Sequence, residues 1–120
     1  MNLTWKRIGI ILAALATASL HLYSAFALYP PPQMSPDPLF TLNGLGYIGL
    51  LGAYILPIPF FQKRHKLVWW VLGGYAILTI VMWVILGDRN FASLAGQIGL
   101  AAKFAELCLL GFLLADRPRA

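Results

Sequence analysis

The sequence predicts an all-α membrane protein, an up-down bundle of four transmembrane helices. Two observations lead to this fold class: four long apolar stretches joined by short polar connections, and a composition of 60% hydrophobic and 11% charged residues. Soluble domains carry about 25% charged residues. A helix needs roughly 20 apolar residues to cross the ~30 Å hydrocarbon core of a bilayer. The four spans are expected at about 8–28, 40–61, 67–86 and 91–115.

The chain has 120 residues, which is room for one integral membrane domain, residues 1–120. Its net charge is +5, and seven of its nine basic residues flank one side of the expected spans: Lys6, Arg7, Lys63, Arg64, Lys66, Arg117 and Arg119. We therefore expect a multi-pass protein of the plasma membrane, and the positive-inside rule places both of its termini in the cytoplasm. This placement favours topology signals that touch anionic head groups over nucleic-acid binding.

The first span has a second interpretation, as a cleaved signal peptide. Two basic residues, the apolar run 8–20 and the triplet Ala25-Phe26-Ala27 are typical of a signal peptide with an A-x-A cleavage site. Cleavage would leave three spans. The apolar run continues through Leu28, however, and a fourth helix gives a consistent charge topology, so we expect four spans.

The connections carry clear local signals. Residues 29–38 include five prolines, which exclude a helix and predict a stiff, extended outer loop. Pro57 and Pro59 are expected to close the second span. Asn90 is expected to cap the fourth helix. Four tryptophans are expected to anchor span ends at the membrane interface: Trp5, Trp69, Trp70 and Trp83.

Small residues predict where the helices approach each other closely. The glycines expected in such contacts are Gly44, Gly46, Gly49, Gly52, Gly73, Gly74, Gly96 and Gly99. Residues 44–49 also match the dinucleotide-binding pattern G-x-G-x-x-G. That motif requires a preceding strand within a βαβ unit, and here the match lies inside a membrane helix, so we reject the nucleotide interpretation.

The fourth span contains the sharpest functional signal, Lys103 and Glu106 near its centre. Their spacing, continued from Gly96 and Gly99, places them on one helix face. A charge at mid-membrane costs roughly 3 kcal/mol on insertion scales, so such residues usually face the bundle interior. Lys103 and Glu106 are one turn apart and are expected to pair, which recovers part of that cost.

Because a helix rises about 1.5 Å per residue, the depth of each residue in the membrane can be compared between spans. His21 and Tyr47 fall at a depth close to that of Lys103 and Glu106. We therefore expect a buried polar cluster of His21, Tyr47, Lys103 and Glu106, with Asn43 and Gln97 nearer its outer mouth and Tyr54 near the depth of Glu106. Three interpretations stay open: a satisfied polar core that fixes helix register, a proton relay or ligand pocket, and a contact with a separate membrane subunit.

Catalytic and metal-binding chemistry find little support. Cys108 is the single cysteine, which excludes an intrachain disulfide and a cysteine-built metal site. One buried His and one buried Glu are too few ligands for a metal, and one His cannot supply bis-histidine haem ligation. His65 lies in the basic turn and is expected to be solvated. The aspartates are expected in loops, so no catalytic triad forms. We expect no enzyme activity, no metal and no cofactor.

The chain resembles a group of uncharacterised small four-helix membrane proteins of prokaryotes. The resemblance rests on four features: His21 late in the first helix, the stretch Asn43-Gly44-Leu45-Gly46-Tyr47, the basic turn Lys63-Arg64-His65-Lys66, and Lys103 with Glu106 in the last helix. It covers most of the chain. It implies the four-helix topology and draws attention to these polar positions, but it implies no activity.

The sequence thus favours a small, non-enzymatic integral membrane protein that acts as an accessory or structural subunit. Its expected partners are the lipid bilayer and either a second copy of the chain or another membrane protein, with no nucleic acid. One alternative is a small transporter or proton-relay protein that uses the His/Lys/Glu cluster. Another is a helical bundle that binds a lipid or a quinone-like molecule.

Overall fold

The computed structural model describes residues 3–27, 38–87 and 90–118. This part of the chain is all-α, without a strand, as predicted. It forms α1 (Trp5–Ala27), α2 (Pro38–Ile55), the one-turn α3 (Pro59–Gln62), α4 (His65–Leu86) and α5 (Leu94–Ala115). The four longer helices are each long and apolar enough to cross a membrane, by length and composition. Their orientation in a membrane stays a prediction.

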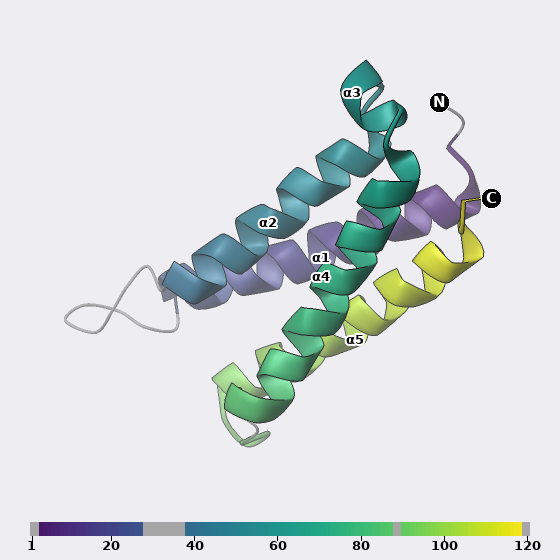
Figure 1. Ribbon diagram of the computed structural model, residues 1–120. Helices are drawn as coiled ribbons and strands as arrows, with labels where there is room; N and C mark the ends of the chain where they lie inside the picture. Colours follow the sequence, from purple (N-terminus) through teal and green to yellow (C-terminus); the bar gives the residue numbers. More distant parts are fainter. Residues whose placement is uncertain (1–2, 28–37, 88–89, 119–120) are drawn as a thin grey trace.

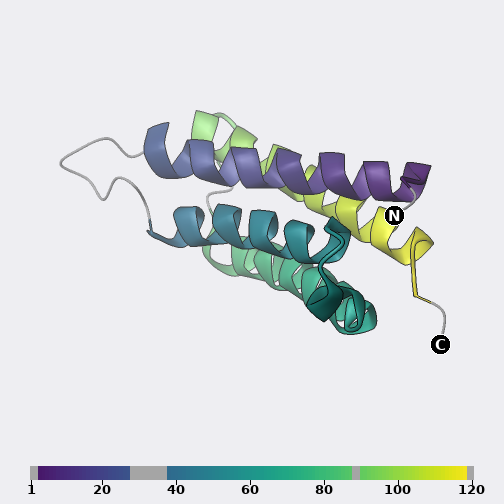
Figure 2. The ribbon, with the colours of Figure 1, turned by 90° about the horizontal axis from the view of Figure 1, so that it is seen from above.

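The four longer helices form a ring in which each one contacts two neighbours (Figure 1). α1 packs along α2 on one side and along α5 on the other, while α4 closes the ring more loosely between α2 and α5. Figure 2 shows the long axes of α1 and α2 side by side, and Figure 1 shows α4 tilted steeply against α1. The start of α1, the end of α2, α3, the start of α4 and the end of α5 lie together, and we call this the basic end; the opposite one is the far end.

The second span is shorter than predicted, because its helix ends at Ile55 and not at residue 61. Pro57 has no backbone N–H to continue the helix and disfavours helical geometry at the residue before it. Ile58 is extended, with φ −93° and ψ 120°, and α3 then begins with Pro59. The two prolines thus close α2, as expected, but a separate helical turn follows them.

The fourth span also begins later than predicted, at Leu94, and its cap is Ser93 and not Asn90. The Ser93 side chain accepts a hydrogen bond from the backbone N–H of Gly96 at 3.1 Å. Asn90 instead closes the preceding turn: its side chain accepts from the N–H of Ala92 at 3.2 Å. The proline-rich segment 29–37 and residues 88–89 lie outside the described residues.

Small residues bring α1 and α2 into close contact, as predicted for Gly44. A Cβ atom at Gly44 would lie 2.7 Å from the Leu22 side chain and 3.0 Å from the Ala18 carbonyl oxygen of α1. Gly46 sits against the Tyr75 hydroxyl, Gly96 against the backbone of Asn90, and Gly99 against the indole of Trp83. The prediction was wrong for Gly49, Gly73 and Gly74, which meet open space, and for Gly52, where only Leu56 is near.

Asp116 joins three helices at the basic end. Its Oδ2 atom accepts a hydrogen bond from the Tyr54 hydroxyl at 2.5 Å and pairs with Arg7 of α1 at 3.4 Å. Tyr54 was expected near the depth of Glu106, and its hydroxyl reaches Asp116 at the end of α5. The prediction of a solvated His65 was also wrong, since its ring lies half-buried 4.6 Å from the ring of Tyr54. Trp69 adds a hydrogen bond to the Leu113 carbonyl at 2.7 Å.

We expect Gly44→Ala to destabilise the bundle by roughly 1–3 kcal/mol, because the added methyl group forces α1 and α2 apart. Gly49→Ala, on the same helix, is the matched control. It should be neutral or stabilise by roughly 0.5–1 kcal/mol, since alanine favours the helix and meets no neighbour there. Unfolding of both variants in detergent, followed by circular dichroism, measures the difference. Equal stability of the two variants would contradict the tight α1–α2 contact.

Candidate functional site

The polar cluster is built around Glu106 of α5, whose side chain is fully buried. One carboxylate oxygen, Oε1, pairs with the ammonium group of Lys103, one turn earlier on the same helix. Lys103 is itself only 6% exposed, so the expected inward orientation of this face of α5 is present. Burying two charges is costly, and their mutual pairing offsets part of that cost.

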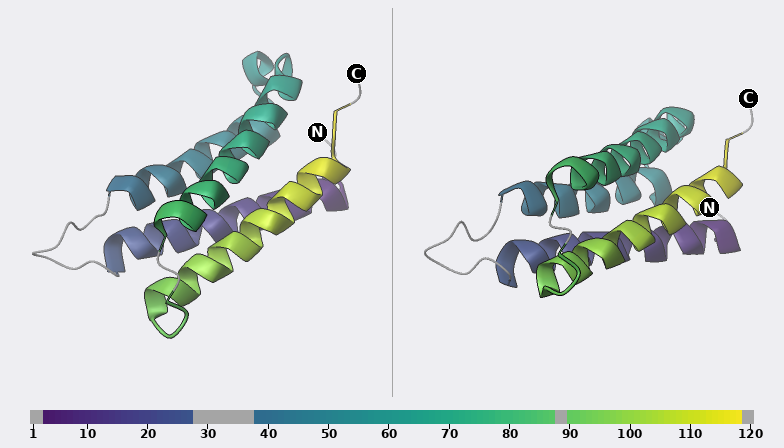
Figure 3. Two further views of the ribbon diagram at one scale, coloured as in Figure 1. Left: turned by 60° about the horizontal axis from the view of Figure 1, so that its bottom comes forward. Right: turned by 90° about the horizontal axis from the view of Figure 1, so that it is seen from below.

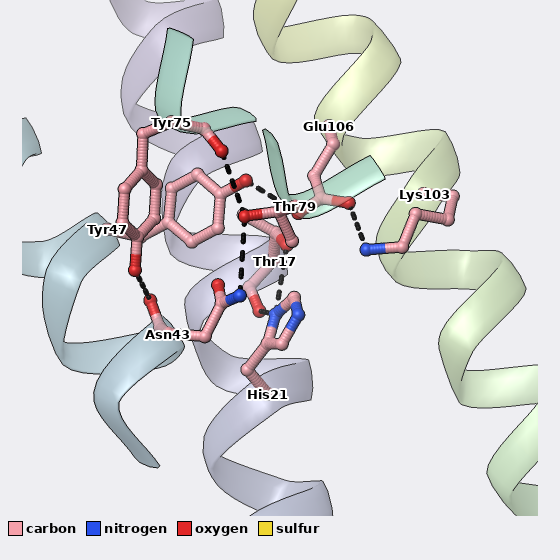
Figure 4. Close-up of polar contacts among 8 residues, drawn as sticks. All are labelled: Thr17, His21, Asn43, Tyr47, Tyr75, Thr79, Lys103 and Glu106. Carbon is pink, nitrogen blue, oxygen red and sulfur yellow. Dashed lines mark hydrogen bonds and ion pairs between the residues drawn. The ribbon is translucent and has the colours of Figure 1, made fainter. Parts of the chain in front are cut away.

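The other carboxylate oxygen of Glu106 accepts a hydrogen bond from Tyr47 across the bundle. The Tyr47 hydroxyl of α2 lies 2.6 Å from Oε2, and the whole side chain is buried. Figure 4 shows Lys103 and Tyr47 reaching Glu106 from opposite sides. Both oxygens are therefore satisfied by protein groups, which is the arrangement that a buried carboxylate requires. This contact links α2 to α5, two helices that do not pack side by side.

His21 of α1 lies beside this cluster, with its ring 6.0 Å from that of Tyr47. Its Nδ1 atom is 2.7 Å from the backbone carbonyl oxygen of Thr17 and 3.2 Å from the Thr17 hydroxyl. Because a carbonyl oxygen only accepts, Nδ1 carries a hydrogen, and Nε2 of the neutral ring is left as an acceptor. In Figure 4 this second nitrogen points toward the side of the cluster where α5 lies.

Asn43, Thr79 and Tyr75 form a hydrogen-bonded chain between α2 and α4. The Asn43 amide donates to the Thr79 hydroxyl at 3.3 Å, and Thr79 donates to the Tyr75 carbonyl at 2.9 Å. The Tyr75 hydroxyl donates a hydrogen bond to the backbone carbonyl oxygen of Asn43 at 2.8 Å (Figure 4). Sequence reasoning left Thr79 and Tyr75 out of the cluster. Their spacing of four residues is the signal that pairs them on one helix face.

A cavity of about 390 Å³ opens between the far-end halves of α1, α2, α4 and α5. The polar side chains that line it are His21, Ser24, Asn43, Thr79, Trp83 and Lys103. Much of the remaining wall is apolar, with Leu20, Phe40, Met82 and Ile98. Glu106 and Tyr47 are not part of the lining, so Lys103 stands between the cavity and the carboxylate that it pairs with. Mostly apolar pockets of this size with a few polar groups are typical of small-molecule sites.

Two buried polar atoms that belong to cavity-lining residues have no hydrogen-bond partner: the Asn43 Oδ1 and the Trp83 Nε1. A buried group without a partner costs about 1–3 kcal/mol, so native proteins rarely leave one. Trp83 was expected as an interfacial anchor. That role stays a prediction; the indole N–H is buried and faces Gly99, the glycine whose missing side chain leaves it room.

Gln97 lies outside the cluster, contrary to the prediction. It is exposed, and its amide donates to the Phe91 carbonyl at 3.1 Å near the start of α5. The remaining site residues of the prediction are close together: Tyr47, Lys103 and Glu106 are joined by direct contacts, and His21 and Asn43 border them at the cavity. Within the described ranges, no three His, Cys, Asp or Glu side chains gather in a group that could hold a metal ion.

Comparisons with known proteins give a family and no activity. No curated protein matches the chain, and no solved structure matches it. Residues 4–114 match the family of unknown function DUF7475, which spans α1 to α5 and includes every residue of the polar cluster and of the cavity wall. The chain therefore belongs to the DUF7475 family.

Proposed function

We propose that this protein is a non-enzymatic integral membrane protein that binds a small, uncharged amphipathic molecule in the far-end cavity. Of the roles that the sequence leaves open, ligand binding accounts best for the geometry. The observation that carries the proposal is the pair of unpartnered polar atoms, Asn43 Oδ1 and Trp83 Nε1, on residues that line one cavity. Both atoms are themselves buried, so a bound molecule would pair with them once their side chains turn toward the cavity, and it would then remove their desolvation cost.

The charges of the cavity favour an uncharged ligand. Lys103 is the cation in the lining, and Glu106 directly behind it neutralises that charge. An anionic ligand would have to compete with a carboxylate that is already in place, and a cationic ligand would meet the ammonium group. A charged ligand of either sign would therefore find no unpaired opposite charge in this cavity. A neutral molecule carries no charge that must be paired when it is buried.

The hydrogen-bonding groups define the ligand further. Trp83 N–H and the free hydrogens of the Lys103 ammonium group donate, while Asn43 Oδ1 and His21 Nε2 accept. A molecule with both carbonyl and hydroxyl oxygens on a flat or compact head, such as a quinone/quinol couple or the head of a neutral lipid, matches this set. Its apolar part would lie against the aliphatic and aromatic wall of the cavity.

A second role, in proton transfer, draws on one specific observation. Lys103 separates the cavity from Glu106 and Tyr47, so the cavity adjoins a continuous series of titratable groups. Such series inside a membrane often serve as relays. In this structure, however, both Glu106 oxygens are occupied by Lys103 and Tyr47, which favours a static polar core over a moving proton.

Asn43→Ala and Trp83→Phe should each reduce the amount of bound small molecule by about tenfold, because each removes one hydrogen bond worth roughly 1–1.5 kcal/mol. The measurement is mass spectrometry of organic extracts from protein purified in mild detergent. Gln97→Ala and Trp5→Phe are matched controls, since they remove the same chemical groups outside the cavity.

Two outcomes would overturn the ligand proposal. One is an extract of the unaltered protein with no small molecule beyond detergent and bulk lipid. The other is equal loss from the cavity variants and from their controls. Proton or solute flux through the protein in sealed vesicles, abolished by Lys103→Met with the fold intact, would favour the relay instead.

Lys103→Met alone should destabilise the bundle by roughly 3–5 kcal/mol, because it leaves the buried Glu106 carboxylate without its cation. Adding Glu106→Leu should recover much of this loss, since an apolar pair removes both desolvation costs. A double-mutant cycle on unfolding free energies, measured in detergent, tests the coupling. Additive effects of the two substitutions would show that the pair is not buried as described.

A further inference from the structure

A second cavity lies at the basic end of the molecule, away from the ligand site proposed above. It is an open cleft of about 810 Å³ between the start of α1, the start of α4, the end of α5 and the residues that follow it. Three cationic side chains line it, Lys6, Lys66 and Arg117, together with the indoles of Trp69 and Trp70. Figure 3 shows the start of α4 and the end of α5 as separate ribbons at the basic end.

The positive charge of this cleft is not neutralised by the described part of the chain. Lys6, Lys66 and Arg117 take part in no ion pair among the residues that the structure describes. The nearby carboxylate of Asp116 already pairs with Arg7 and accepts a hydrogen bond from the Tyr54 hydroxyl. Glu106 is buried near the middle of α5 and pairs with Lys103. Three cations, of which Lys66 and Arg117 are exposed, therefore border one open space and give it a positive potential that attracts an anion.

The walls of the cleft suit an amphipathic anion better than a free one. Trp70 is 62% exposed and Leu114 64% exposed, so apolar surface continues from the cleft along the flanks of α4 and α5. Tryptophan indoles favour the head-group level of a bilayer. The Trp69 indole is held in place by its hydrogen bond to the Leu113 carbonyl, which fixes this wall.

We propose that the basic-end cleft binds the phosphate head of an anionic phospholipid, with its acyl chains along α4 and α5. Lys6, Lys66 and Arg117 contact the phosphate oxygens as charge-assisted donors. A zwitterionic head group is disfavoured, because its ammonium group would enter a cleft that already holds three cations. This proposal does not depend on the ligand of the far-end cavity. It does require that the helices lie in a membrane.

The test uses the full-length protein in mixed micelles that contain equal amounts of phosphatidylglycerol and phosphatidylcholine. Native mass spectrometry then counts the lipids retained on the protein. The altered protein carries Lys66→Gln with Arg117→Gln. The control carries Lys63→Gln with Arg64→Gln, which removes the same two residue types at the same end of the molecule, outside the cleft.

We expect the unaltered protein and the control to retain phosphatidylglycerol preferentially, and the cleft variant to lose that preference by about tenfold or more. Equal loss in both variants would show diffuse surface attraction and overturn the proposal. A third arm adds inorganic phosphate at constant ionic strength. Displacement of the lipid by phosphate at millimolar concentration would identify a free phosphate anion as the ligand, and would also overturn it.

Discussion

The buried carboxylate of Glu106 is the constraint on which the rest of this structure depends. It lies fully inside the bundle, where an unpaired charge would cost several kcal/mol. Lys103 supplies the opposite charge from the same helix, and Tyr47 supplies a hydrogen bond from α2. These contacts fix which face of α5 points inward and the height at which α2 stands opposite it. Lys103 lines the far-end cavity and pairs with Glu106 behind it, so it separates the two.

The two ends of the molecule differ in the way polar groups are satisfied. At the basic end, Asp116 draws α1, α2 and α5 together through Arg7 and Tyr54. At the far end, Asn43 Oδ1 and Trp83 Nε1 have no hydrogen-bond partner, and the bundle there includes α4, the most loosely packed of the four longer helices. Native proteins rarely leave buried polar groups unpaired, so this pair supports the proposed ligand site. For a member of a family of unknown function, the far-end cavity is therefore a defined site at which to test ligand binding.

Sequence patterns predicted the four longer helices and placed Tyr47 with Lys103 and Glu106 in one cluster, but they did not predict the individual contacts between helices. The four longer helices and the pairing of Lys103 with Glu106 follow from apolar length and from the spacing of one turn. The glycines were a poorer guide. Gly44 and Gly49 look alike in the sequence, yet one meets Leu22 and the other meets open space. A glycine allows a neighbouring helix to approach closely, but the crossing angle between the two helices decides whether that approach occurs at the glycine.

By itself, the sequence determined that four helices are long and apolar enough to cross a membrane, because apolar length can be counted along the chain. It also determined which face of α5 points inward, because a buried charge is costly wherever the helix packs. Only the tertiary structure decided that Tyr54 reaches Asp116 and not Glu106, that Gln97 stays outside, and that Trp83 turns its N–H inward. Those outcomes depend on the tilt of α4 and on the rotation of each helix about its axis. Both arise from packing between segments that are distant in the chain.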